Sequence, residues 1–566
     1  MGKNIKEKRL ITAALPYVNN VPHLGNIVGS HLPADIFARF CRQKGYDTLF
    51  IGGTDDHGTP IEIAAQKQNI SPGELADYFY KIHKEIYDWF GFSYDNFSRT
   101  SKKVHEDLTQ GMFKIIYERG YILEKTLKLP YCPNCKRFLP DRYLEGVCPA
   151  CNCDSARGDQ CEKCGRVLDP IELKNPRCTI CGSHNIEFKD VKHLFLNLEG
   201  LSSKLETWIK SNIHWRSQVK SLALGWLKEG LKPRCITRDL KWGIKVPLKG
   251  FEDKVFYVWF EAPIGYISST KEKFKNWKDF WQDPNSKIYH FVGKDNIVFH
   301  TIFWPGTLLA HGEFSLPYNV VGLQFLNYEG EKFSKSRGKG VFCENLSKSG
   351  LPADYWRFYS SLIIPETNDT DFKWEEFKER INGDLIGNFA NFIHRTQSLI
   401  NAQLEGEIKK QNLKKQNILD KKFIEKIQKS VLKIDTLFEK IELRETLKEI
   451  LSLSSEGNKY FDYQAPWRQI KEDKLGAEKT LILCFNLCKT LAILIHPFLP
   501  ETSQKIWREL GLKGNAFDKN NWERAGKIDI FSCKIEKPEI LFKKLENEQM
   551  ETLKKEISKI TIAAKD

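Results

Sequence analysis

Two short segments far apart in the sequence carry the residue types best suited to phosphate chemistry. The first is HLGN (His23–Asn26), which separates an apolar run typical of a buried strand (Leu10–Leu15) from a segment with helical periodicity. An imidazole and a bare glycine backbone at such a junction favour a phosphate site, because a helix N-terminus attracts anions. The second is EGEKFSKSRG (Glu329–Gly338), a glycine-flanked loop with Lys332 and Lys335. Cations placed over phosphates are what nucleotidyl transfer requires.

A pair of carboxylates follows the second expected strand. Thr48–Ile51 is an apolar run, and it leads into GGTDDHG (Gly52–Gly58), which contains Asp55. A carboxylate at the carboxyl end of a parallel strand faces the ligand crevice, where it suits a substrate ammonium group. Glycine and aspartate are also turn residues, so a solvated turn is the alternative. The position at the strand end favours the functional interpretation.

Eight cysteines lie in four CxxC pairs between Tyr131 and His184, and Cys153 is left over. Two residues between thiolates allow both to bind one tetrahedral ion, so the pairs predict two Cys₄ zinc sites of the closed, structural kind. Disulfides are disfavoured in a chain with no secretion signal. We expect the inner pairs to share one zinc and the outer pairs a second, with sequential pairing as the alternative. The first set is Cys148, Cys151, Cys161 and Cys164, and the second is Cys132, Cys135, Cys178 and Cys181.

Composition limits the class of protein that holds these groups. The chain has 566 residues, of which 41% are hydrophobic and 28% charged, and this predicts a soluble protein of several domains. The net charge of +14 suits a polyanionic partner such as nucleic acid. Neither a membrane-spanning apolar stretch nor an apolar signal core is found, so we expect no membrane contact and a cytoplasmic location.

The order of the elements indicates an α/β fold with a doubly wound parallel sheet, interrupted by the cysteine-rich insert and followed by an α-helical bundle. Further strands are expected at Val255–Phe260, Ile288–Val292 and Tyr318–Gly322, and strand signals fade after Glu375. Long segments with helical periodicity then predict the bundle. The expected divisions are the first half of the sheet domain (1–120), the cysteine-rich insert (121–230), the second half of the sheet domain (231–325), the lysine loop with the segment that follows it (326–380) and the bundle (381–566).

The two signatures, in this order, resemble those of class I aminoacyl-tRNA synthetases. The segments Val258-Trp259, Ala262–Tyr266 and Gly293–Asn296 further resemble segments of the methionyl-tRNA synthetases. The insert with its four CxxC pairs resembles that of the archaeal type. The resemblance implies a Rossmann-like catalytic domain and ATP-dependent attachment of methionine to tRNA through methionyl-adenylate. It also implies Mg²⁺ with ATP, and initiator and elongator methionine tRNAs as partners. A monomer is expected, because the chain carries no further C-terminal module of the kind some relatives have.

Residue by residue, the resemblance assigns roles to positions of this sequence. Asp55 would hold the amino group of methionine. The catalytic residues would be His23, Asn26, Lys332 and Lys335, and ATP would be bound by His23, Gly25, Asn26, Lys294, Asp295 and Lys335. The methionine pocket would be Leu15, Tyr17, Asp55, Trp259, Pro263, Tyr266, Phe299 and His300. The anticodon would be read by Asn391, Arg395 and Trp467.

Two positions depart from the family pattern, and three other functions are weighed. Asn26 stands where many class I enzymes have histidine, and Phe333 replaces the commoner methionine as a packing residue. The alternatives are the cysteine enzyme of the same class, a synthetase-like RNA-binding protein without activity, and a zinc-dependent nucleic-acid-binding regulator. The cysteine enzyme holds its zinc in the amino-acid pocket, whereas these thiolates lie in the insert. The regulator would explain the cysteines but not the two signatures.

Overall fold

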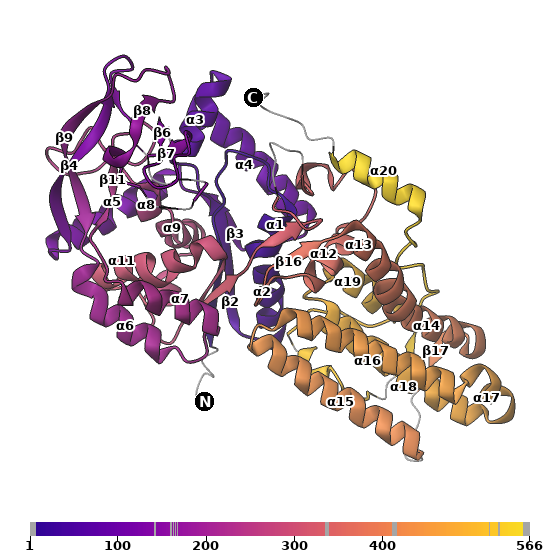
Figure 1. Cartoon of the computed structure of the whole chain (residues 1–566). Helices are drawn as coiled ribbons and strands as arrows, with labels where there is room; N and C mark the ends of the chain where they lie inside the picture. Colours follow the sequence, from indigo (N-terminus) through magenta and orange to yellow (C-terminus); the bar gives the residue numbers. More distant parts are fainter. Residues whose placement is uncertain are drawn as a thin grey trace.

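The computed structural model describes residues 7–140, 143–158, 161, 163–164, 166, 168–333, 339–409, 416–519, 521–529 and 532–558. The chain forms two large parts (Figure 1). The N-terminal part holds a central sheet with the cysteine-rich insert at its outer end, and the C-terminal part is a bundle of long helices.

The central sheet has five parallel strands in the order β14-β13-β1-β2-β3. In the middle, Leu10 of β1 pairs with Ile288 on one side and Leu49 on the other. The expected strands at Leu10–Leu15, Thr48–Ile51, Ile288–Val292 and Tyr318–Gly322 are therefore present, with slightly different ends. Their bounds are β1 Lys8–Ala13, β2 Asp47–Thr54, β3 Asn96–Arg99, β13 Lys287–Gly293 and β14 Asn319–Leu323.

Helices cover both faces of this sheet, because its side chains alternate between two apolar cores. Ile11 and Ala13 belong to the core under α2 and α4, whereas Leu10 belongs to the core under α5, α9, α10 and α11. All of these side chains are fully buried. The helices are α1 Leu24–Asn26, the π-helical turn Ile27–His31, α2 Leu32–Lys44, α3 Thr59–Gln68, α4 Pro72–Trp89, α5 Lys103–Glu118, α9 Ile264–Lys273, α10 Lys278–Trp281 and α11 Trp304–His311.

In its described residues, the insert between the two halves of the sheet contains a four-stranded and a three-stranded antiparallel sheet and two α-helices, and a short strand after it, β11, pairs elsewhere. Its long hairpin pairs β4 with β9, from Ile122 opposite Leu196 to Tyr131 opposite Glu187. The elements are β4 Ile122–Cys132, β5 Arg137–Phe138, β6 Leu144–Val147, β7 Ala156–Arg157, β8 Lys174–Cys178, β9 Glu187–Leu196, α6 Ser202–Ser211, α7 Ser217–Lys228, β10 Arg234–Cys235 and β11 Thr237–Arg238.

The strand expected over Val255–Phe260 is wrong for most of its length. Only Val255–Phe256 is strand (β12), and the chain then forms a short helix, α8 Val258–Glu261. The Ala262 N–H donates to the Val258 carbonyl at 2.8 Å, which closes this helical turn. Short apolar runs have no periodicity that separates strand from buried helix. The turn brings Trp259 to the end of the sheet instead of into it.

The C-terminal part is helical, as expected, with the almost wholly buried α18 at its centre. Two short strands join the parts, since β15 beside the lysine loop pairs in parallel with β16. The elements are β15 Leu326–Tyr328, α12 Ala353–Leu362, β16 Thr370–Phe372, α13 Trp374–Arg380, the π-helical segment Ile381–Ala390, α14 Asn391–Leu404, β17 Glu407–Ile408, α15 Ile418–Glu439, α16 Leu443–Gln464, α17 Pro466–Glu472, α18 Lys474–Ile495, α19 Pro500–Glu509, β18 Cys533–Lys534 and α20 Asn547–Ser558.

Arg357 of α12 joins the two parts through its fully buried guanidinium group. It donates to the Phe90 carbonyl at 3.0 Å and to Asp35 Oδ2 at 2.8 Å, both in the sheet domain. It also donates to the carbonyls of Phe498 at 2.7 Å and Pro497 at 3.0 Å, which follow α18. The helical bundle is thereby fixed to α2, the helix that follows the HLGN turn.

Candidate active site and metal centres

A cavity of about 700 Å³ opens at the carboxyl edge of the central sheet, where β1, β2 and β13 end. In a parallel α/β sheet this edge is where ligands bind. The cavity brings together fourteen of the residues that sequence reasoning placed in the catalytic, ATP and methionine sites: Leu15, Tyr17, His23, Gly25, Asn26, Asp55, Trp259, Pro263, Tyr266, Lys294, Asp295, Phe299, His300 and Lys332. The remaining one, Lys335, lies outside the described residues.

The carboxylate of Asp55 lies in the wall of this cavity and is 4% exposed. Its backbone is held by the loop after β1, because the Asp55 N–H donates to the Pro16 carbonyl at 2.9 Å and its carbonyl accepts from Val18 at 3.3 Å. Burial and the nearby Glu261 raise the pKa of the Asp55 carboxyl well above its ordinary value. An opposite charge brought next to such a group favours its ionised form.

Aromatic side chains form the wall beside Asp55. The indole N–H of Trp259 donates to the Tyr17 hydroxyl at 2.9 Å, and its ring meets Phe299 edge-on at 5.6 Å. Tyr266 and His300 are joined between the tyrosine hydroxyl and Nε2 at 3.0 Å. His300 Nδ1 lies 2.9 Å from the Asn296 carbonyl, which only accepts, so Nδ1 carries the proton and Nε2 accepts from Tyr266. Burial lowers the pKa of His300 to about 4, so the imidazole is neutral at neutral pH.

The HLGN turn presents a partly buried imidazole at the start of α1. Asn26 Oδ1 accepts from the His23 N–H at 3.0 Å, which leaves the amide NH₂ of Asn26 to face a ligand. A Cβ on Gly25 would lie 2.9 Å from the His23 ring, so any larger residue there would displace the imidazole. The His23 ring stacks on Phe333 with centroids 4.6 Å apart, and burial lowers its pKa to about 4. Phe333 is therefore a packing residue, as its position suggested.

Two lysines stand at the side of the cavity formed by β13 and the residues before the lysine loop. The ammonium groups of Lys294 and Lys332 lie 5.4 and 5.8 Å from the centre of the same ring, that of Phe325. All three residues line the cavity. Positive charge therefore gathers around Phe325 in the cavity wall.

Sequence reasoning missed a buried carboxylate with two histidines behind this wall. Glu261 is fully buried, and its two oxygens lie 3.0 Å from His57 Nδ1 and 2.6 Å from His105 Nε2. Burial raises the pKa of the Glu261 carboxyl, but the two imidazoles outweigh it and bring the pKa below its ordinary value. This cluster holds α8, which carries Trp259. His57 stood in the singled-out GGTDDHG segment, whereas nothing in the pattern around His105 indicated the contact.

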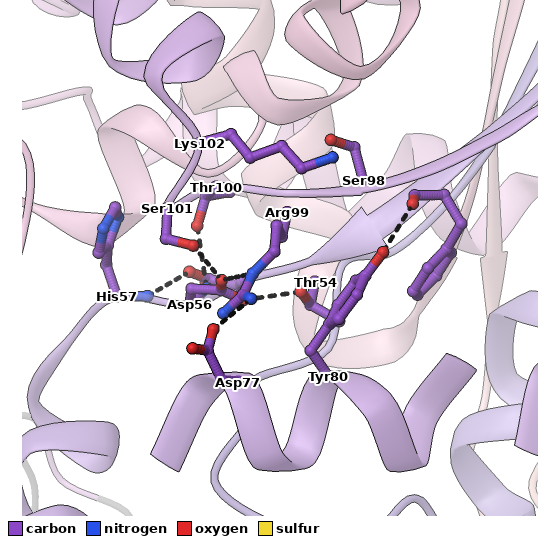
Figure 2. Close-up of polar contacts among 12 residues, drawn as sticks. Thr54, Asp56, His57, Asp77, Tyr80, Ser98, Arg99, Thr100, Ser101 and Lys102 are labelled. Atoms are coloured by element: carbon purple, nitrogen blue, oxygen red, sulfur yellow. Dashed lines mark hydrogen bonds and ion pairs between the residues drawn. The ribbon is translucent and has the colours of Figure 1, made fainter. Parts of the chain in front are cut away.

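The neighbouring Asp56 was also singled out only as part of that segment. Figure 2 shows its carboxylate among Thr54, Arg99 and Ser101, with Asp77 and Tyr80 of α4 on the far side of Arg99. Asp56 Oδ1 accepts from Thr54 at 2.7 Å, and Oδ2 accepts from Arg99 Nε at 2.5 Å.

The cysteines of the insert form two groups of four, and within each group all sulfur atoms lie within 4.8 Å of one another. The groups join the inner pairs and the outer pairs, which is the nested arrangement and not the sequential one. The closest S···S distances are 3.6 Å for Cys151 and Cys161 and 3.7 Å for Cys132 and Cys181. A tetrahedral Zn²⁺ with Zn–S bonds of about 2.3 Å requires S···S distances of about 3.8 Å. Both groups therefore have the size that such an ion needs.

The three positions expected to read the anticodon lie together at one end of the helical bundle. Arg395 of α14 pairs with Asp462 at 2.6 Å, and its guanidinium carbon is 5.8 Å from the centre of the Trp467 ring. Asn391 lies one helical turn before Arg395 and donates to Asn458 at 3.4 Å. Trp467 is 37% exposed, and Tyr463, near the end of the preceding helix α16, is 75% exposed. The arrangement offers exposed rings and a cation, which suit an unstacked base.

A doubly wound parallel sheet with the HLGN turn and the residues before a lysine loop around one cavity defines a class I aminoacyl-tRNA synthetase. The family described as "tRNA synthetases class I (M)" matches residues 9–397, and "Anticodon binding domain of methionyl tRNA ligase" matches residues 414–561. The chain therefore belongs to the methionyl-tRNA synthetases, the ligases that attach methionine to tRNA.

Individual relatives agree. The methionine–tRNA ligase of Treponema denticola is 43% identical over 98% of this chain and 73% of its own length. That of Methanopyrus kandleri is 41% identical over 97% of this chain and 81% of its own length. These names support the methionine enzyme and not the cysteine enzyme or a protein without activity.

A solved structure has the same fold. Mycobacterium tuberculosis methionyl-tRNA synthetase bound by methionyl-adenylate aligns with a TM-score of 0.79 at 23% identity, over 95% of this chain and all of that one. Within the described part of this chain, no helix combines the length and apolar content needed to cross a membrane.

Proposed function

We propose that the cavity activates methionine as the adenylate, with Asp55 holding the substrate ammonium group. The supporting observation is a buried carboxylate, which costs free energy without a cation, in the wall of a cavity that also has a phosphate-type turn. The ammonium group supplies the missing charge. The thioether then lies among Tyr17, Trp259, Tyr266 and His300, because sulfur packs favourably against aromatic rings.

In the first step the methionine carboxylate attacks the α-phosphate of ATP, and pyrophosphate leaves. His23 and the Asn26 amide donate to the phosphates from the sheet side, since both are placed by the α1 turn. Lys294 and Lys332 offset the charge that moves to the pyrophosphate, and Lys335 joins them from the loop. Mg²⁺, which accompanies ATP in such sites, would be held chiefly by the phosphate oxygens. In the second step the terminal ribose hydroxyl of tRNA attacks the adenylate.

The other parts of the chain serve this reaction from a distance. Each cysteine group holds one structural Zn²⁺, because all-thiolate closed sites leave no position for a substrate. The end of the bundle near Trp467 binds the anticodon of the methionine tRNAs, initiator and elongator. The division between the synthetase part and the bundle is proposed at residue 380.

ATP–pyrophosphate exchange tests the assignment, with methionine, cysteine, valine and leucine compared in parallel. We expect exchange with methionine alone, a loss of rate in Lys335→Ala, and a rise in the methionine KM of about 10- to 100-fold in Asp55→Asn. That range corresponds to a hydrogen bond between charged groups, about 1.5–3 kcal/mol. Exchange supported by another amino acid, or an unchanged KM in Asp55→Asn, would contradict the assignment.

A further inference from the structure

We propose that Asp56, through its ion pair with Arg99, is a positioning residue that holds the Asp55 carboxylate in the direction required by the substrate ammonium group. The inference rests on the proposed role of Asp55. Asp55 and Asp56 follow β2 directly, and of the two only Asp55 lines the cavity. The Asp56 carboxylate is instead buried among Thr54, Arg99 and Ser101 (Figure 2).

The Asp56 carboxylate is fully buried and fully engaged. Oδ1 accepts from the Thr54 hydroxyl at 2.7 Å, and Oδ2 accepts from the Ser101 hydroxyl at 2.6 Å as well as from Arg99 Nε at 2.5 Å. These partners come from two neighbouring strands and the turn after the second. The position of Asp56 is therefore set by contacts from several directions, which leaves the side chain little freedom.

The backbone of Asp56 is held as firmly as its side chain. Its N–H donates to the Thr100 hydroxyl at 2.9 Å, and its carbonyl accepts from the Trp242 indole at 2.6 Å. The backbone of Asp55 is held as well, because its N–H donates to the Pro16 carbonyl and its carbonyl accepts from the Val18 N–H, both in the loop after β1. The Asp55 side chain thus leaves a peptide that is fixed at both ends.

The negative charge of Asp56 makes its contact with Arg99 an ion pair. Arg99 is 13% exposed at its side chain, and it also donates to Asp77 at 2.5 Å and lies 4.8 Å from the centre of the Tyr80 ring. One guanidinium therefore joins β2, β3 and α4. Asparagine at position 56 would keep the shape but would remove the negative charge that pairs with Arg99. Its neutral oxygen can accept from Arg99 and Ser101 only with the NH₂ turned to the Thr54 hydroxyl, so a charge-assisted contact becomes a weaker one. The turn that carries Asp55 would then be held less firmly and would shift.

Catalytic groups need placement within about half an ångström, so such a shift would weaken substrate binding without unfolding the protein. A weaker Asp55 contact has a chemical signature that general loosening of the cavity does not have. Only ligands with an amino group would lose affinity. A ligand that keeps the thioether chain but has no amine would bind as before.

The experiment measures inhibition constants in methionine-dependent ATP–pyrophosphate exchange for two probes. Methioninol has the amino group, whereas 4-(methylthio)butanoate has the carboxylate and the thioether but no amine. In Asp56→Asn we expect the methionine KM and the methioninol inhibition constant to rise together by at least tenfold. The constant for 4-(methylthio)butanoate and the KM for ATP should change less than twofold.

Two further variants keep the result interpretable. Asp77→Asn is the matched control, because it removes the 64%-exposed outer partner of Arg99 and leaves every Asp56 contact in place. We expect it to behave like the unaltered protein. Thr54→Val removes one hydrogen bond to Asp56 from a buried position, and a rise of about threefold in both amine-dependent constants is expected. Thr54→Val therefore tests the positioning role of Asp56 even if Asp56→Asn does not fold.

Asp55→Asn separates this inference from the proposed function. If Asp55→Asn fails to distinguish the two probes, the role of Asp55 itself is wrong. If Asp55→Asn distinguishes them but Asp56→Asn or Thr54→Val weakens both probes equally, or neither, the positioning role of Asp56 is overturned.

Discussion

Replacing Arg357 by methionine tests how the helical bundle is fixed to the sheet domain. Arg357→Met keeps much of the side-chain volume and removes four donated hydrogen bonds, three of them to the carbonyls of Phe90, Pro497 and Phe498. The fourth goes to Asp35, which still keeps Arg39 at 2.9 Å and Ser93 at 2.7 Å.

The expected loss follows from these contacts. An unsatisfied buried group costs about 1–3 kcal/mol, and a carbonyl is at the low end because it has two lone pairs. Three carbonyls give about 3 kcal/mol. The Asp35 carboxylate loses one of the two guanidinium groups that offset its charge, which adds about 1 kcal/mol. The total loss is about 4 kcal/mol. This agrees with about 3–5 kcal/mol for breaking a buried ion pair, and it is a large share of the stability of a typical protein.

The free energy of unfolding is measured in urea, with tryptophan fluorescence and circular dichroism followed together, because coincident transitions are needed to treat the chain as two-state. Arg380→Gln is the control. Arg380 is half exposed and makes surface ion pairs with Asp384 at 3.1 Å and Glu376 at 3.5 Å, so its loss should cost less than about 0.5 kcal/mol. A loss below about 1 kcal/mol in Arg357→Met would refute the reasoning, since it would mean that the carbonyls find other donors.

Three other predictions concern the metal centres, the tRNA and pH. Cys178→Ser should release one of two zinc equivalents to a chromogenic chelator, whereas Cys153→Ser, outside both cysteine groups, should keep both; equal zinc contents would contradict the site. Trp467→Ala should raise the KM for methionine tRNA about tenfold, as stacking is worth about 1–3 kcal/mol, while pyrophosphate exchange stays unchanged; a parallel loss of exchange would contradict an anticodon role. Burial lowers the pKa of His83 to about 4, below the value of about 6.5 in the unfolded chain. Between these two pH values the unfolded state binds more protons than the folded state. The free energy of unfolding therefore falls as the pH is lowered from about 6.5 to about 4. His83→Gln should therefore lose about 2 kcal/mol less stability than the unaltered protein between pH 7 and pH 5 in urea unfolding, and an identical pH dependence would count against a buried neutral imidazole.

Much of the fold follows from local pattern. Ser71 caps α4 by accepting from the Glu74 N–H and is followed by proline, a common first residue of a helix, and β13 has nearly the bounds expected from its apolar run. These elements agree with their local propensities. The sequence of Val255–Phe260 does not show that the strand ends at Phe256 and a helix begins at Val258. The helix places Trp259 at the cavity, and this requirement comes from the tertiary structure and not from the local pattern.

The site likewise contains residues that the sequence could place and residues that it could not. Residues in short motifs, such as His23 and Asp55, could be placed because their position at the end of a strand is visible in the sequence. The partners behind them could not. His105 and Glu261 meet across 156 residues, and Arg99 reaches Asp56 from the next strand, so no spacing within a motif records either contact. The nested cysteine groups needed the three-dimensional structure for the same reason, since four CxxC pairs allow more than one arrangement.

The buried groups also explain where charge can be placed in this cavity. His23 and His300 have pKa values lowered to about 4 by burial, so both are neutral donors or acceptors at neutral pH. Positive charge lies instead on Lys294 and Lys332 at one side. A charge that interacts equally with ATP and with the transition state would tighten binding without raising the rate. In the proposed mechanism, neutral groups orient the nucleotide and cations on long side chains lie where pyrophosphate forms, so the electrostatic stabilisation is directed to the charge that moves.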